Sequence, residues 1–455
     1  MKHFKFFAFA LFTFISLAIA GGSATVGFTS VKLASSTVSA HQGRSSTWGP
    51  SDEQFGSGFA GSAGTVSYGT QTATFTRAGV YVWKAVSGSF TNIWVFEGLS
   101  NSDIIDLADI ETDSTGKLSI ALSVNGAVKV SPTLSLSCST FNIYCVIIVQ
   151  ISPTGVITGF ASTNAAHIIP KDLFLDANNG MTVTGFGSGA VTLAGQSLNL
   201  GTGSGFLVRL SSAGAGIGSL KGFTNFISGC YNSFNGLTYV TGQSSGSNLV
   251  VASYSAAGTT QSSIVTSFSA GATSISSATG YSIVCLGTVG VHISGDFRTD
   301  AGVTLSLGSV TRTSSVLDTL TAAFDTSLNV LSSNQGNAVY DGHGYGLVKS
   351  TTGAVWGAGG LFGGAGTFSG FATPNYGSTK NDLYVSSISA SGSSYANVSV
   401  ADVSAAASAV RYRGMSMSLS SKILFVVDVI GSVKFGTLSA SVKSGQQVAI
   451  VVYTL

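Results

Sequence analysis

Two short segments of this sequence combine side chains suited to recognising a sugar or a peptide. They are His292-Ile-Ser-Gly-Asp-Phe-Arg-Thr-Asp300, in the longest of the repeated units described below, and Tyr340-Asp-Gly-His-Gly-Tyr345. We expect both to be loops, which carry function more often than the framework that holds them. The alternative for either segment is ordinary surface structure. The candidate ligand-binding residues are His292, Asp296, Arg298, Asp300, Tyr340, Asp341, His343 and Tyr345.

Acidic residues gather in one stretch, because six of the eighteen lie between Glu97 and Asp113. Since Ca²⁺ prefers several oxygen ligands, Asp103, Asp106 and Asp109 are candidates for a calcium site. Their spacing is not that of an EF-hand loop. The alternative is a solvated strand and turn. The sequence indicates no other cofactor.

The sequence contains no convincing catalytic motif. Gly242-Gln-Ser-Ser-Gly246 fits the G-x-S-x-G pattern of hydrolases. It lies between two predicted strands, whereas a nucleophile elbow needs a strand-to-helix turn. A glycosidase needs two carboxylates that flank one bond, and the remaining acids are scattered singly. We therefore favour a non-enzymatic protein and leave the question of activity open.

The four cysteines predict disulfides rather than a zinc site, because no C-x-x-C occurs. Cys138 and Cys145 bracket a short segment and would clamp one hairpin loop. Cys230 and Cys285 would then pair between neighbouring repeats. Four cysteines allow three connectivities, and free buried thiols are a further alternative. Asn397 begins the only N-glycosylation sequon.

The N-terminus has the layout of a secretory signal peptide over residues 1–20. A positive stretch, Met1–Lys5, precedes an apolar run and the small-x-small cleavage site Ala18-Ile19-Ala20. A membrane anchor is the alternative, but the apolar run is shorter than the ~20 residues of a spanning helix. We expect a secreted or cell-surface protein with no membrane span after cleavage.

Composition excludes disorder and argues against two classes of partner. Only 8% of the residues are charged and 44% are hydrophobic, whereas a disordered chain has low hydrophobicity and high net charge. The net charge is +2, without a basic cluster. This argues against nucleic acid or anionic lipid as a main partner. A charge-poor surface rich in Ser, Thr and Gly suits packing against copies or other partners.

The elements that must position all these residues are repeated. An apolar strand recurs seven times, starting near residues 82, 147, 207, 250, 321, 384 and 449. Other elements precede it, such as a glycine turn with an alternating strand (Gly64–Phe75, Gly431–Val442) and a turn with a short strand (Asp176–Gly185). Each unit offers about four short strands, which predicts an all-β, seven-bladed β-propeller. A β-solenoid or multiple β-sandwiches are alternatives, and counts of six or eight blades stay open.

The units resemble the bacterial-type β-propeller repeats of secreted and surface proteins. The first part of the repeat matches Asn235–Gly242 and Asp176–Gly185, and the second matches Gly189–Gly195. The third part matches Phe206–Gly214 and Leu249–Gly258. The resemblance covers roughly residues 55–455, and the tryptophan that usually ends the unit is mostly missing. It implies a stable extracellular scaffold and does not imply one ligand.

We therefore divide the chain into a signal peptide (1–20), an N-terminal segment (21–54) and the propeller (55–455). The chain ends directly after an apolar strand, so the last blade lacks its outer strand. We expect Thr25–Val38 to supply that strand and close the ring, which would remove a free strand edge.

Three functions remain open at this point. The leading hypothesis is a non-enzymatic surface or matrix scaffold that supports adhesion or assembly, with an extracellular protein, a glycan or the protein itself as partner. A lectin-like module would show near-equivalent aromatic and polar residues in several blades. A hydrolase or lyase acting on extracellular polysaccharide would show a carboxylate pair in the central channel.

Overall fold

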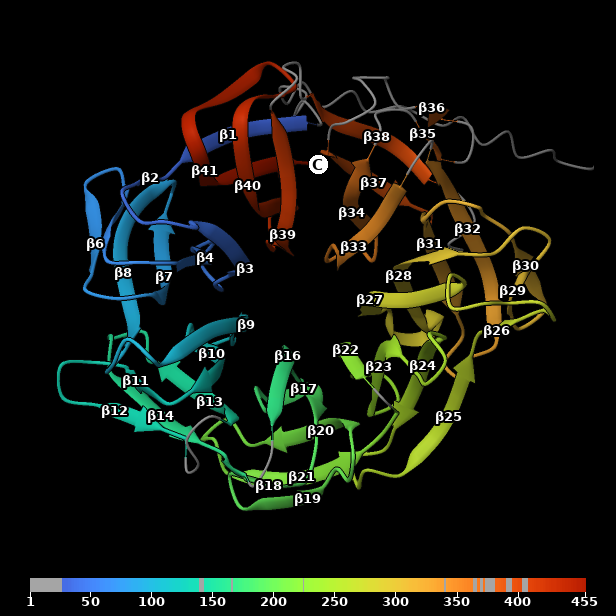
Figure 1. The fold of residues 1–455 in the computed structure, drawn as a ribbon, viewed down its shortest axis with the longest axis horizontal. Helices are drawn as coiled ribbons and strands as arrows, with labels where there is room; N and C mark the ends of the chain where they lie inside the picture. Colours follow the sequence, from blue (N-terminus) through green and yellow to red (C-terminus); the bar gives the residue numbers. More distant parts are fainter. Residues whose placement is uncertain are drawn as a thin grey trace, which may run out of the picture.

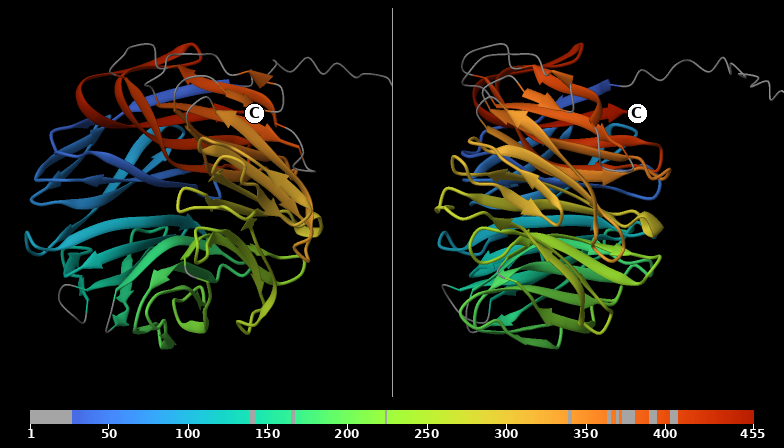
Figure 2. Two further views of the ribbon diagram at one scale, coloured as in Figure 1. Left: turned by 45° about the vertical axis from the view of Figure 1, so that its right-hand side comes forward. Right: turned by 90° about the vertical axis from the view of Figure 1, so that its right-hand side faces the viewer.

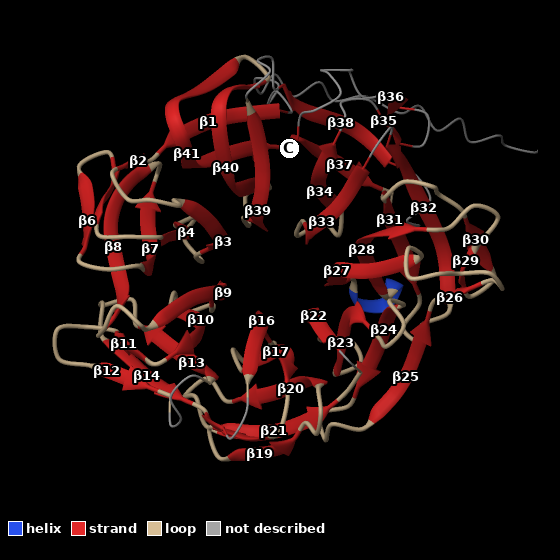
Figure 3. Cartoon of the chain, viewed as in Figure 1, coloured by secondary structure: helices blue, strands red, loops and turns tan. Residues whose placement is uncertain are grey.

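The computed structural model describes residues 27–138, 143–164, 167–223, 225–338, 341–362, 366–368, 371–372, 381–389, 395–402 and 408–455. Within these ranges every regular element is a β-strand except the 3₁₀ turn η1 (Gly287–Val289), as Figure 3 shows. Most strands form seven antiparallel sheets of four, set as blades around a central axis (Figure 1). The chain is therefore a seven-bladed β-propeller, as the repeats predicted. No helix in these ranges is long and apolar enough to cross a membrane.

Each blade runs from an inner strand beside the axis to an outer strand at the rim. Blade 1 consists of β3 (Gln42–Trp48), β4 (Gln54–Ala60), β7 (Gly79–Val86) and β8 (Ser89–Gly98). Blade 2 consists of β9 (Ile104–Thr112), β10 (Leu118–Asn125), β13 (Tyr144–Ile151) and β14 (Ile157–Ala161). Blade 3 consists of β16 (Ile168–Leu175), β17 (Met181–Gly187), β20 (Ser204–Leu210) and β21 (Gly216–Lys221).

The remaining blades follow the same order. Blade 4 consists of β22 (Asn225–Asn232), β23 (Leu237–Gln243), β24 (Leu249–Tyr254) and β25 (Thr260–Val265). Blade 5 consists of β27 (Ser277–Cys285), β28 (Val291–Arg298), β31 (Asp318–Phe324) and β32 (Val330–Ala338). Blade 6 consists of β33 (Asp341–Lys349), β34 (Val355–Phe362), β37 (Asn381–Ile388) and β38 (Tyr395–Asp402). Blade 7 consists of β39 (Ala409–Met417), β40 (Lys422–Phe435), β41 (Leu438–Thr454) and β1 (Gly27–Leu33).

The seven apolar segments of the sequence are the third strands of the seven blades. A third strand lies inside its blade, and each of its faces packs against a neighbouring blade. In β13, Val146 and Ile148 belong to the apolar cluster shared with blade 3. Ile147 and Val149 belong to the cluster shared with blade 1. Because both faces are buried, the strand reads as a continuous apolar run rather than an alternating one.

The hydrophobic core is divided among the interfaces between blades. In the described residues, one cluster of buried apolar side chains lies at each of the seven interfaces. A fully buried side chain of the size of Val, Leu or Phe contributes about 1.5–3 kcal/mol. Each blade therefore depends on its two neighbours for most of its burial, and the fold is stable as a ring.

An extra hairpin between the second and third strands reaches back to the preceding blade. These hairpins are β5–β6 (Gly64–Tyr68, Gln71–Phe75), β11–β12 (Ala127–Lys129, Ser135–Ser137), β18–β19 (Ala190–Leu193, Gln196–Asn199), β29–β30 (Leu305–Leu307, Val310–Arg312), β35–β36 (Gly366–Phe368, Phe371–Ala372) and an extension of β40 and β41. Hairpin β5–β6 pairs with β2 (Ser35–Ser36), β11–β12 pairs with β8, and β18–β19 pairs with β15 (Thr163–Asn164). Hairpin β29–β30 pairs with β26 (Ser267–Phe268), β35–β36 pairs with β32, and the extension of β40 and β41 pairs with β38. Blade 4 has a short turn there instead, which explains the close spacing of its repeat.

The two ends of the described chain meet in blade 7. Outer strand β1 pairs antiparallel with β41, from Gly27 opposite Thr454 to Leu33 opposite Ala449. Figures 1 and 2 both show this N-terminal strand among the C-terminal strands. One composite blade thus closes the ring with residues from Thr25–Val38, the segment expected to do so.

The propeller begins before residue 55, the start expected from the sequence. Strands β1, β2 and β3 all precede that residue, and β3 is the inner strand of blade 1. Its sequence, Gln-Gly-Arg-Ser-Ser-Thr-Trp, has neither an apolar run nor apolar alternation. The pattern therefore does not reveal the strand, which neighbouring blades bury.

Candidate functional site

The inner strands of the seven blades surround the central axis of the ring (Figure 1). A cavity of about 630 Å³, the central channel, lies between them and is lined by side chains from β3, β9, β16, β22, β27, β33 and β39. Small-ligand sites measure ~300–1,000 Å³. Because every blade contributes to it, we take this channel as the candidate site.

Each inner strand has a β-bulge at the same level of the channel. The pairing register with the second strand shifts there, so the inner strand carries one residue more than its partner can match. Bulges change the direction in which a side chain points. The bulge residues all line the cavity, and they are Arg44 with Ser45, Ala108, Lys171, Ile227, Tyr281, Tyr345 and Arg413.

The bulges also share a position in the sequence. Each lies five residues before the first residue of the turn that joins the inner strand to the second strand. Ala108 precedes Asp113 in this way, and Lys171 precedes Asp176. Counting back from these turns is a signal that finds Tyr281 and Arg413, neither of which the motifs in the sequence indicated.

Three carboxyl groups lie on the wall formed by blades 2 and 3. Asp109 and Glu111 belong to β9, and Asp172 belongs to β16. Their hydrogen bonds cross from blade 1 to blade 4, so these acids tie four blades together beside the channel. The donors are the Ser45 hydroxyl and the Leu173 amide (3.2 Å) for Asp109, the Gly229 amide (2.7 Å) for Asp172, and the Thr47 hydroxyl (3.1 Å) for Glu111.

Two of these acids favour their protonated form. Burial raises the pKa of Asp109 well above its usual range, and the negative charges of Asp172 and Glu111 raise it further. A hydrogen bond with Asp172 acts in the same direction. Burial, followed by the charge of Asp172, raises the pKa of Glu111 to about 8. Asp109 and Glu111 are therefore largely uncharged at neutral pH.

Three tyrosine rings form the opposite part of the wall. Tyr345 stacks on Tyr412, with centroids 5.7 Å apart and an interplanar angle of 17°, and meets Tyr281 edge-on at 5.6 Å. Tyr281 and Tyr345 are the bulge residues of blades 5 and 6, and Tyr412 precedes the bulge of blade 7. Burial raises the pKa of Tyr412, and the charge of Asp109 adds to this. The tyrosines and the acids thus face one cavity.

Arginines stand beside the tyrosines. Arg413 forms an ion pair with the buried Asp428, and Arg44 pairs with Asp106 at an N–O distance of 2.6 Å. Arg411 lies with Arg413 and the three tyrosines around a second cavity of about 380 Å³. The side chain of Arg411 is exposed and has no hydrogen bond or ion pair with the described residues.

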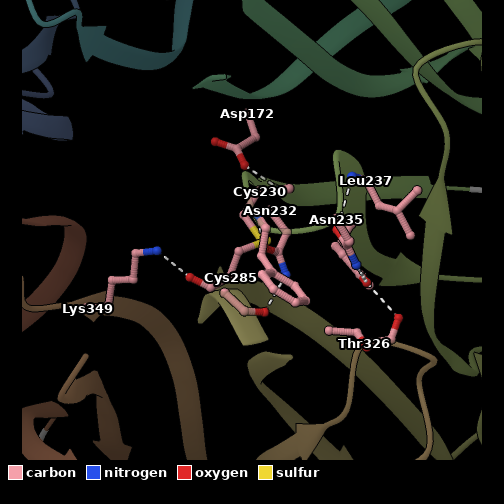
Figure 4. The surroundings of a disulfide bond; sticks show 12 residues. Asp172, Cys230, Asn232, Asn235, Leu237, Cys285, Thr326 and Lys349 are labelled. Carbon is pink, nitrogen blue, oxygen red and sulfur yellow. Dashed lines mark hydrogen bonds between the residues drawn. A yellow bond between two sulfur atoms is a disulfide. The ribbon is translucent and has the colours of Figure 1, made fainter. Parts of the chain in front are cut away.

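Both disulfides that the cysteine spacing predicted are present. Cys138–Cys145 closes the connection between β12 and β13. Cys230–Cys285 joins the inner strands of blades 4 and 5 and lines the channel (Figure 4). In the same view, Lys349 points to the Cys285 carbonyl, to which it donates a hydrogen bond. The second disulfide thus fastens blade 4, which lacks the extra hairpin, to its neighbour.

The segment His292–Asp300 is not the loop expected from the sequence. Its first seven residues form β28, the second strand of blade 5, where His292 and Asp296 are buried. Both faces of this strand pack against neighbouring blades, so the polar residues that alternate along it do not mark exposure. Asp296 shares a hydrogen bond with Tyr281 and therefore supports the channel wall from behind.

Arg298 and Asp300 lie away from the channel. Arg298 is exposed at the end of β28. Asp300 braces the adjacent loop by accepting hydrogen bonds from the Thr273 amide at 2.7 Å and the Ser276 hydroxyl at 2.6 Å. These hydrogen bonds indicate a structural role for Asp300.

The second expected loop is also a strand. Asp341 and His343 belong to β33, the inner strand of blade 6, whereas Tyr340 lies outside the described residues. Glycine is depleted in strands, so the glycines at alternate positions of this segment do not indicate a strand in the sequence. Gly344 is needed there, because a Cβ atom would lie 2.4 Å from the Ser294 hydroxyl oxygen. Tyr345 is the sequence candidate that the structure places in the channel wall.

The three aspartates suggested for calcium do not converge. Asp103 accepts hydrogen bonds from the Ser100 amide in the turn before β9 and from the Ala127 amide at the start of β11. Asp106 pairs with Arg44, and Asp109 belongs to the carboxyl group cluster of the channel. Among the described residues, no group of three His, Cys, Asp or Glu side chains could hold a metal ion.

The structure also places the glycosylation sequon and the G-x-S-x-G motif. Asn397 lies within β38. Gly242–Gly246 covers the end of β23 and the turn that leads to β24. This is the strand–turn–strand setting expected, so the G-x-S-x-G pattern does not form a nucleophile elbow.

Comparison with known proteins assigns this chain to no family. No protein-family model matches the chain, and no curated protein matches it. Similar solved structures include a chain of a mitotic checkpoint complex, with a TM-score of 0.49 and 10% identity over 100% of this chain and 99% of that chain. The Dos1 propeller has a TM-score of 0.44 and 11% identity over 93% and 95%. Hydrazine synthase of Kuenenia stuttgartiensis has a TM-score of 0.43 and 10% identity over 86% and 96%.

Proposed function

We propose that this protein is a non-enzymatic, carbohydrate-binding β-propeller that holds its ligand in the central channel, against the tyrosine rings of blades 5 to 7. One observation carries the proposal. Tyr281 and Tyr345 occupy the equivalent bulge position in neighbouring blades, and Tyr412 continues the same aromatic wall. Near-equivalent aromatic residues in several blades are the feature that separates a lectin-like module from a plain scaffold.

The chemistry of this wall suits a sugar. A tyrosine offers an apolar ring and a polar hydroxyl, so it can cover the apolar face of a sugar ring and bond one of its hydroxyl groups. Protonated carboxyls on the opposite wall, at Asp109 and Glu111, can both donate and accept hydrogen bonds. Mixed donors and acceptors around a mostly preformed cavity are typical of small-ligand sites.

The carboxyl groups support a second candidate function, hydrolysis or lysis of a polysaccharide. Glu111, with its pKa raised to about 8, has the protonation state of a general acid at neutral pH. However, a glycosidase needs two carboxyls that flank one bond. Asp109 and Asp172 bond to each other and to the amides of adjacent inner strands. Because these acids are engaged in hydrogen bonds between blades, we favour binding without catalysis over hydrolysis.

We keep the proposal that the protein is exported and acts at a cell surface or in a matrix. The two disulfides are compatible with an oxidising compartment. Adhesion would then follow from the recognition of surface glycans, with no need for a separate scaffold function.

A glycan array compares the wild-type protein with the double variant Tyr281→Ala/Tyr345→Ala. Phe234→Ala is the matched control, because this aromatic side chain is 63% exposed on a turn outside the channel. We expect saturable binding by wild type and control, and at least a tenfold loss in the double variant, which corresponds to about 1.4 kcal/mol. Undiminished binding by the double variant would overturn the proposal. Release of shortened saccharides by the wild type would favour the second candidate.

A further inference from the structure

Among the described side chains, only some of the cations in and beside the channel are paired with acids. Arg44 and Arg413 have carboxylate partners. The side chains of Lys171 and Arg411 have no hydrogen bond or ion pair with the described residues. The Lys349 ammonium group contacts a neutral carbonyl oxygen, that of Cys285. Among the described side chains, three positive charges therefore face or border the cavity without an ion-pair partner.

Among the described acids that line the cavity, only Asp172 is left as a negative charge against these three cations. Burial keeps Asp109 and Glu111 largely protonated at neutral pH, because it raises the pKa of each. The Asp172 carboxyl is engaged with the Gly229 amide and with Asp109. Burial lowers the pKa of Lys349, as expected for an ammonium group that lacks a carboxylate. The imbalance thus favours an anionic occupant.

Arg411 is the cation best placed to meet such an occupant. It lies around the cavity of about 380 Å³ together with Tyr281, Tyr345 and Tyr412, and these tyrosines also belong to the aromatic wall. A guanidinium group has five N–H donors in a planar fork, which fits a carboxylate or sulfate with two parallel hydrogen bonds. A sugar ring on the tyrosines would bring an acidic substituent to this fork.

We propose that the channel selects an anionic saccharide, whose carboxylate or sulfate group binds Arg411 while its ring lies against Tyr345 and Tyr412. This inference rests on the proposed carbohydrate-binding function and specifies its ligand class. Lys171 and Lys349 add positive charge to the wall of the cavity of about 630 Å³. A chain of several acidic sugars would therefore be favoured over a single one.

The test compares two probes of equal shape, tetragalacturonate and its methyl ester, by isothermal titration calorimetry. The variant is Arg411→Gln, and the control is Arg298→Gln, an exposed arginine outside both cavities. We expect wild type and control to bind the acid at least tenfold more tightly than the ester. Arg411→Gln should lose that preference and keep its affinity for the ester. Tighter binding of a heparin tetrasaccharide would support the proposal with sulfate as the anion.

Two results would count against the inference, and they differ in meaning. Equal affinity of the wild type for acid and ester would overturn the anionic preference and leave carbohydrate binding intact. No binding to either probe or to any neutral glycan of the array would overturn the proposed function itself, and the inference with it.

Discussion

The two parts of the channel wall differ in what their side chains contact. In the carboxyl part, on blades 1 to 4, the acids are occupied: Asp109 and Asp172 accept hydrogen bonds from adjacent inner strands and share one with each other. On blades 5 to 7, Tyr281, Tyr345 and Tyr412 touch one another through their rings, and Arg411 has no partner among the described residues. Both parts are formed by inner strands that carry a β-bulge at the equivalent position.

The contrast shows how one repeated strand supports two roles. A carboxyl at or next to the bulge reaches the amide of the next blade and joins blades together. A tyrosine at the bulge covers the channel wall with its ring. We therefore expect variants of the carboxyl part to change mainly stability, and variants of the tyrosine part to change mainly binding.

The largest effect should come from the disulfide at the border between the two parts. Cys230→Ser/Cys285→Ser opens a loop of 55 residues and should lower the free energy of unfolding by about 4 kcal/mol, whereas Cys138→Ser/Cys145→Ser should cost about 2 kcal/mol. Chemical denaturation without reductant measures both. A smaller loss for the 230–285 pair than for the 138–145 pair would contradict the role of this bond in holding blade 4.

Asp172→Ala, in the carboxyl part, should cause the next largest loss in the free energy of unfolding. It leaves the Gly229 amide without its acceptor, which costs about 1–3 kcal/mol for a buried donor. Asp106→Ala is the control, because its side chain is 52% exposed and surface pairs contribute about 0–1 kcal/mol. Denaturation and saccharide titration should show lower stability with unchanged affinity. A selective loss of affinity would place Asp172 in the binding site instead.

The carboxyl part should also make stability depend on pH. The pKa of Glu111 is raised to about 8 in the folded protein, whereas the ordinary pKa of a glutamate is 4.5. An acid with a raised folded-state pKa contributes stability that is complete below its unfolded pKa and is lost as pH rises through the folded pKa. Melting temperatures between pH 4.5 and 9 should therefore fall more for the wild type than for Glu111→Gln. Parallel curves would show that Glu111 ionises normally.

The smallest effect on stability should come from the tyrosine part. Tyr345→Ala removes two ring contacts, each worth about 0.5–1.5 kcal/mol, at a residue that is only half-buried. We expect about 1 kcal/mol in unfolding free energy but at least a tenfold loss of saccharide affinity. Tyr345→Phe keeps the stacked ring and should recover most of the stability. A large loss of stability with unchanged affinity would reverse the assignment of the two parts.

The sequence predicted the propeller because its third strands are buried on both faces and read as apolar runs. It did not predict the inner strands, since β3 and β33 are rich in Gly, Ser and charged residues and gain their burial from other blades. Tyr345 was recognised in a motif, but Tyr281 and Tyr412 come from other blades and meet it only in the folded ring. The fixed distance from bulge to turn is the signal that would have aligned them.

The most direct test of the central claim is a crystal structure of the full protein with bound tetragalacturonate. We predict a sugar ring against Tyr345 and Tyr412 in the channel, with a carboxylate at hydrogen-bond distance from Arg411, about 2.7–2.9 Å. Saccharide bound on the rim or on the outer strands, with the channel empty at saturating ligand, would contradict it.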